Sequence, residues 1–152
     1  MWEMNVESSI LAASLASKYL KADGLCVFVG AKAVAVHPTP DMLAYAMAKS
    51  AVASLATNLS INSPFSVTLL LPYKTFKNFS HLLSFLLPFF SEVLDTEANR
   101  KSMPTADTSK WTPVHLIAEK VAEFLKEPKE NVNGKSWLIT TRAGETKFTI
   151  YQ

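Results

Sequence analysis

Leu25-Cys26-Val27-Phe28-Val29 is a continuous apolar run, and such a run predicts a strand that is buried on both faces of a parallel sheet. Ala22-Asp23-Gly24 lies directly before it and ends a pattern of apolar residues at helical spacing over residues 5–20. A second run of the same kind covers residues 66–71 and ends at Pro72. Helix and buried strand therefore alternate in the first half of the chain.

The alternation continues towards the other end of the chain. The turn Pro38-Thr39-Pro40-Asp41 predicts Asp41 as the N-cap of an alanine-rich helix over residues 41–59. A helix over about residues 113–125 precedes a last strand over residues 136–140. The order α-β-α-β-α-β predicts an α/β fold, in which helices flank a parallel sheet.

Composition and charge exclude several classes of protein. With 49% hydrophobic and 18% charged residues, the 152-residue chain is typical of a globular protein. The net charge of +2 comes from scattered lysines, so no nucleic-acid surface is expected. The chain opens without a signal-like segment, and the apolar stretch 79–90 is shorter than the ~20 residues that cross a bilayer. We therefore expect a cytoplasmic protein that does not enter a membrane.

Two residue types bear on cofactors and metals. The only cysteine, Cys26, lies in the first apolar run, and the three histidines share no spacing, so no metal site is predicted. The four glycines, Gly24, Gly30, Gly134 and Gly144, are scattered. A dinucleotide-binding sheet needs a cluster of glycines in its first β-α turn, where backbone amides approach the pyrophosphate. That phosphate-binding turn is missing from this sequence.

Tyr45 and Lys49 are the residues with the clearest chemical potential. They are four positions apart in a predicted helix, so both project from one face. A nearby cation lowers the pKa of a phenol, which suits proton transfer. The spacing alone is weak, because Tyr73 and Lys77 repeat it. Context favours the first pair, because it follows a strand that ends at Val29-Gly30-Ala31.

This arrangement resembles the active site of the short-chain dehydrogenase/reductase family. The resemblance implies that Tyr45 gives or takes the proton and that Lys49 lowers its pKa and binds the nicotinamide ribose. It also implies that Asn5 is the catalytic asparagine of the preceding helix, although an asparagine there could equally be an N-cap. The implied fold is a partial Rossmann-type sheet, with residues 1–152 as the C-terminal portion and the N-terminal nucleotide-binding half lacking.

Within that family, the sequence is similar to dihydropteridine reductases. Ala31 stands where most of the family has a serine, and the segments 30–33, 94–104 and 111–113 resemble this group. The resemblance implies reduction of a quinonoid dihydropteridine to the tetrahydropteridine with NADH or NADPH. It also implies that Thr96 contacts the nicotinamide carboxamide, although Thr96 could equally have a structural role.

The family resemblance also implies a partner and leaves two function classes open. In this family the helices that correspond to residues 5–20 and 41–59 form a subunit interface, so a homodimer is expected. Residues 73–91 match nothing in the resemblance and form an atypical apolar insertion. The first class is an oxidoreductase, which would be a pterin reductase or another short-chain reductase. The second class is a truncated non-catalytic chain that keeps the dimer helices.

Overall fold

The computed structural model of the chain describes residues 1–32, 42–72, 93–127 and 129–151. The predicted cap Asp41, the second pair Tyr73 and Lys77, and the predicted insertion 73–91 lie outside these residues. The elements, in chain order, are η1 (Glu3–Glu7), α1 (Ser8–Tyr19), β1 (Leu25–Val29), α3 (Leu43–Asn62), β2 (Ser66–Pro72), β3 (Leu94–Asp95), α4 (Glu97–Ser102), η3 (Thr108–Lys110), β4 (Thr112–Pro113), α5 (Val114–Phe124), α6 (Lys129–Val132), β5 (Ser136–Arg142) and β6 (Glu145–Ile150).

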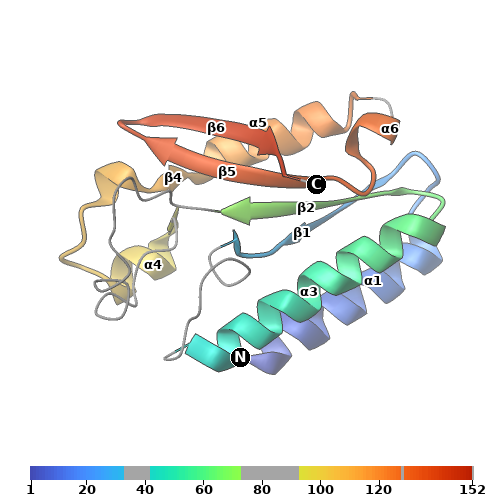
Figure 1. Ribbon diagram of the computed structural model, residues 1–152, viewed down its shortest axis with the longest axis horizontal. Helices are drawn as coiled ribbons and strands as arrows, with labels where there is room; N and C mark the ends of the chain where they lie inside the picture. Colours follow the sequence, from blue (N-terminus) through green and yellow to red (C-terminus); the bar gives the residue numbers. More distant parts are fainter. Residues whose placement is uncertain (33–41, 73–92, 128, 152) are drawn as a thin grey trace.

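The main sheet has the strand order β1-β2-β5-β6 (Figure 1). β1 pairs with β2 and β2 pairs with β5 in parallel, so the predicted α/β fold is confirmed. β6 is antiparallel to β5, and the turn between them contains Ala143 and Gly144, both with positive φ, as in the tight turns that match strand twist. β6 contains no continuous apolar run, so the sequence does not predict it.

Helices cover both faces of the sheet (Figure 1). Side chains alternate along β2, so Val67, Leu69 and Leu71 face α1 and α3, whereas Leu70 faces α5. The first core joins these residues to helix and strand residues Ala13, Phe28, Val52, Ala56 and Phe65. The second joins Leu70 to Phe124, Val132 and Ile139. All seven residues of β2 are buried, as expected for a central parallel strand.

Two predicted helices differ from the structure at their ends. The helix predicted over residues 5–20 begins as one turn of π-helix, η1, in which the Ser8 N–H donates to the backbone oxygen of Glu3. Periodicity cannot separate a π-turn from an α-turn over so short a stretch. The helix predicted over residues 41–59 runs from Leu43 to Asn62. Among the described residues, no helix is long and apolar enough to cross a membrane.

Ile139 tests the second core. Its side chain is fully buried on β5, and replacing it with alanine removes apolar contacts and leaves a cavity. We expect Ile139→Ala to lower the free energy of unfolding by about 2–5 kcal/mol, measured by urea denaturation. Ile150→Ala is the matched control, because Ile150 is on the neighbouring strand and 56% exposed; its cost should stay below about 1 kcal/mol. Equal losses would contradict this core.

Candidate active site

Tyr45 and Lys49 lie one turn apart in the first half of α3, so both side chains project from one face. Lys49 Nζ donates a 2.9 Å hydrogen bond to the backbone oxygen of Val29, the last residue of β1. The same nitrogen lies 5.8 Å from the centroid of the Tyr45 ring. Lys49 is therefore bonded to the end of β1. Among the described residues β1 is an edge strand in which only Phe28 is buried, so the prediction that residues 25–29 are buried on both faces is wrong.

Burial decides the protonation of both groups. It raises the pKa of the Tyr45 phenol above 10.0 and lowers the pKa of the Lys49 ammonium below 10.5, because the charged form of each loses hydration. The spacing predicted the opposite direction for Tyr45. In the structure the Lys49 ammonium is hydrogen-bonded to the Val29 carbonyl, and desolvation controls the phenol. Tyr45 is therefore protonated at neutral pH.

Asn5 lies inside η1, and η1 packs against α3, the helix that carries Tyr45. Asn5 Nδ2 donates to the backbone oxygen of Met1 at 3.0 Å, and the Asn5 backbone oxygen accepts from Ser9 Oγ at 2.5 Å. The N-cap alternative for Asn5 is wrong, because the N-cap of η1 is Trp2 and the N-cap of α1 is Glu7. Single π-turns occur often at functional sites, but a catalytic role for Asn5 stays a prediction.

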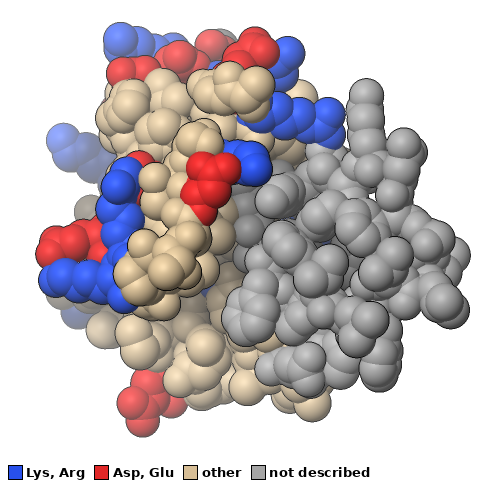
Figure 2. Space-filling model, turned by 90° about the vertical axis from the view of Figure 1, so that its left-hand side faces the viewer, with Lys and Arg blue, Asp and Glu red and all other residues tan. Residues whose placement is uncertain are grey.

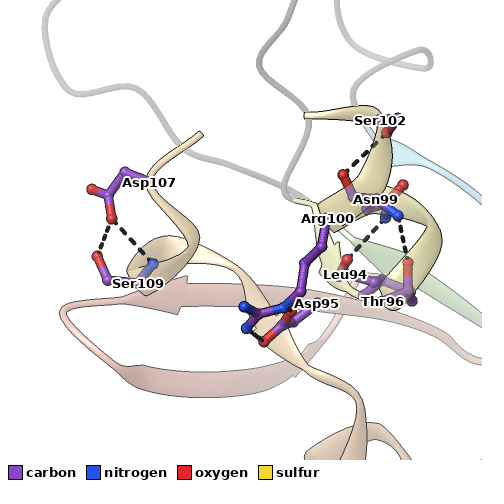
Figure 3. A network of polar contacts seen from close by, with 8 residues as sticks. All are labelled: Leu94, Asp95, Thr96, Asn99, Arg100, Ser102, Asp107 and Ser109. Atoms are coloured by element: carbon purple, nitrogen blue, oxygen red, sulfur yellow. Dashed lines mark hydrogen bonds and ion pairs between the residues drawn. The ribbon is translucent and has the colours of Figure 1, made fainter. Parts of the chain in front are cut away.

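Thr96 is the N-cap of α4, and its Oγ1 accepts a hydrogen bond from the Asn99 N–H at 3.2 Å (Figure 3). Thr96 therefore has the structural role that the sequence left open, as a helix N-cap. Asn99 also donates from Nδ2 to the backbone oxygen of Leu94 at 2.9 Å. Sequence reasoning missed Asn99, although its position three residues after a threonine is a capping spacing that could have indicated it.

The elements that carry the predicted site residues lie towards one end of the sheet. β1 and β2 run towards the end at which α4 and the start of α3 lie (Figure 1). Ligands of open α/β sheets bind at the carboxyl ends of the strands. Figure 2 shows the molecule from this end, and acidic and basic side chains are mixed over its described part. Tyr45 and Lys49 lie together on α3, and Asn5 lies on η1, which packs against α3. Thr96 makes its described contacts within its own loop.

Two of the predicted residues have the chemistry that the nicotinamide end of a dinucleotide would need. Lys49 and Thr96 carry hydrogen-bonding groups that suit ribose hydroxyls and a carboxamide. The four glycines form no cluster in a β-α turn: Gly30 is the only one that follows a strand towards a helix, Gly24 precedes β1, and Gly134 and Gly144 precede β5 and β6. The described residues therefore suit the nicotinamide end and supply no glycine-rich cradle for the pyrophosphate.

The raised pKa of Tyr45 gives a direct test. We expect the phenol to ionise above pH 10.0, since burial favours its neutral form. Stability should then fall as the pH rises through the unfolded-state value of about 10, because the unfolded state releases a proton that the folded state keeps. The difference in phenolate absorbance between the wild type and Tyr45→Phe isolates this titration, with exposed Tyr19→Phe as the control. A titration midpoint of the Tyr45 phenol below pH 10.0 would show that burial does not control its pKa.

Comparisons with known proteins bear on the resemblance predicted from the sequence. No family model matches the chain. A dihydropteridine reductase from Dictyostelium discoideum is 30% identical over 153 aligned residues, which cover 98% of this chain and 58% of that protein. The chain therefore spans little more than half the length of this curated relative.

Solved structures show the same fold. A short-chain dehydrogenase from Burkholderia cenocepacia J2315, in complex with NADP, matches with a TM-score of 0.60 and 19% identity over 93% of this chain and 54% of that chain. Pen from Bacillus thuringiensis matches with a TM-score of 0.51 and 15% identity over 90% of this chain and 40% of that chain. The predicted resemblance is therefore confirmed: this chain has a partial Rossmann-type fold like that of short-chain dehydrogenases, and it is similar over nearly its whole length to a dihydropteridine reductase.

Proposed function

We propose that this chain is the C-terminal part of a short-chain reductase that converts a quinonoid dihydropteridine to the tetrahydropteridine with NADH or NADPH. The observation that carries the proposal is the Tyr45–Lys49 pair, held at the end of β1 by the bond from Lys49 to the Val29 carbonyl. The similarity to a dihydropteridine reductase supports the substrate class. The NADP complex of the Burkholderia cenocepacia protein supports the cofactor class.

Each residue of the pair has a distinct part in this proposal. An ammonium has three N–H donors, and within the described residues Lys49 uses one on the Val29 carbonyl, so two remain for the hydroxyls of a nicotinamide ribose. Tyr45 is protonated at neutral pH, so its phenol can donate the proton that a reduction consumes. The bound nicotinamide would supply the hydride.

Ala31 fits this substrate better than it fits an ordinary ketone. Its methyl side chain is buried and cannot hydrogen-bond a carbonyl oxygen, as the serine of most family members would. A quinonoid dihydropteridine is already an activated hydride acceptor, so its reduction depends less on polarisation by the protein. The alanine therefore favours the pterin over an unactivated carbonyl compound.

A homodimer belongs to the same proposal. α1 carries Leu11 and Leu15 on its exposed side, and α3 carries Leu43 and Met47 at the same four-residue spacing. Exposed apolar residues on two adjacent helices are typical of a protein–protein contact. We infer that two copies pair through these helices.

A non-catalytic chain that keeps this surface is the second candidate. The scattered glycines favour it, because pyrophosphate binding would need a cradle that this chain lacks. It would pair with another subunit through α1 and α3 and leave the chemistry to that subunit. The two candidates differ in turnover and in NADH binding, and they agree in dimer formation.

Turnover separates the two candidates. With NADH and quinonoid dihydropterin, the purified chain should oxidise NADH, and Tyr45→Phe should lower the rate by about 100- to 10,000-fold because the proton donor is lost. Tyr19→Phe is the matched control, because Tyr19 is exposed on α1 and should keep the full rate. Turnover that survives Tyr45→Phe would contradict the role of Tyr45. A dimer with neither turnover nor NADH binding would favour the non-catalytic chain.

The dimer surface has its own test. Light scattering coupled to size exclusion should give twice the monomer mass for the wild type. Leu15→Glu places a charge among apolar contacts and should yield monomers. Leu125→Glu is the control, because Leu125 is 63% exposed at the end of α5, against 48% for Leu15. A wild type that is monomeric at micromolar concentration would refute the surface.

A further inference from the structure

Thr96 is held by polar contacts rather than by packing. α4 has six residues, none of them buried, so its position cannot come from an apolar face. Three hydrogen bonds join side chains of α4, which follows Thr96, to β3, which precedes it (Figure 3). Asn99 Nδ2 bonds the backbone oxygen of Leu94, and the Arg100 guanidinium binds both carboxylate oxygens of Asp95, at 2.5 and 2.7 Å. The segments before and after Thr96, β3 and α4, are therefore fixed to each other.

These contacts also set the direction of the Thr96 hydroxyl. Its oxygen accepts the Asn99 N–H at 3.2 Å, so one lone pair is occupied. Within the described part of the chain, no hydrogen-bond acceptor takes its proton. A hydroxyl that already accepts one hydrogen bond remains a full donor. Thr96 is therefore prepared to donate to an oxygen that a ligand brings.

The loop is in turn fixed to the main sheet. β3 pairs in parallel with β4, and Leu94 lies opposite Thr112. Thr112, which is fully buried, bonds the Thr141 hydroxyl on β5 at 2.7 Å, and Thr141 bonds Thr146 on β6 at 2.9 Å. Buried hydroxyls that are hydrogen-bonded in this way hold one geometry, because an unpaired one would be costly. Thr96 is thus tied to the same sheet that carries Lys49's partner, Val29.

We propose that Asn99 is a positioning residue, whose side chain holds Thr96 so that its hydroxyl donates to the carbonyl oxygen of a ligand carboxamide. The proposal rests on the proposed function, in which that ligand is a nicotinamide. Asn99 does not touch the ligand itself. It acts through Leu94 and Thr96, because its amide fixes the first turn of α4 against β3.

A double-mutant cycle tests this inference. Asn99→Asp keeps the shape of the side chain and removes the donor to Leu94, and Thr96→Val removes the hydroxyl. We expect each change to weaken NADH binding by about 2- to 10-fold, measured by nicotinamide fluorescence, as loss of one hydrogen bond does. The double variant should lose no more than Thr96→Val alone, because Asn99 acts through Thr96. Losses that multiply would overturn the proposal.

A second readout does not depend on NADH. Three-bond NMR couplings from the Thr96 methyl carbon to the backbone should report one rotamer in the wild type and averaged rotamers in Asn99→Asp. Lys101→Met is the matched control, because it breaks the exposed Lys101–Glu97 pair on the same helix and should leave the couplings unchanged. Unchanged couplings in Asn99→Asp would overturn the positioning role. A wild type that fails to bind NADH while Asn99→Asp averages the couplings would refute the proposed function and keep the positioning of Thr96.

Discussion

The complete burial of β2 is the constraint on which the rest of the structure depends. A strand with β1 on one side, β5 on the other and helices over both faces must satisfy its backbone in the sheet and present apolar side chains on both faces. Its parallel neighbours then need crossover connections, which place α3 on one face and α5 on the other. The carboxyl ends of the parallel strands consequently meet at one end of the sheet.

The chemistry at that end follows from the same packing. α3 lies against β1 and β2, so Lys49 reaches the Val29 carbonyl, a backbone group at the end of its strand. The partial burial that stabilises the helix also removes water from Tyr45 and Lys49, which raises the pKa of the phenol and lowers that of the amine. The groups that carry the proposed proton transfer therefore owe their protonation states to the core beneath them.

The loop that carries Thr96 is built in a different way. The helices over the main sheet are held by apolar contacts, whereas α4 is joined to β3 by an asparagine amide and an ion pair. β4, which pairs with β3, is joined to β5 by a hydrogen bond between two threonine hydroxyls. Polar contacts of this kind are directional, so they can set the orientation of one hydroxyl as well as the position of a helix. Such an arrangement would suit the donor role that we propose for Thr96.

The sequence by itself determined the alternation of helix and strand, because apolar periodicity is a property of neighbouring residues, but only the fold decided that β2 is wholly buried and that β1 is not. The sequence also determined the Tyr45–Lys49 pair, because four positions in a helix fix a shared face. Only the tertiary structure decided the partner of Lys49, the direction of the Tyr45 pKa and the contacts of Asn99. It also decided the polar edge strand β6. The physical reason is that burial and most hydrogen-bond partners at this site come from residues distant in the chain, as Val29 is from Lys49, and periodicity carries no information about them.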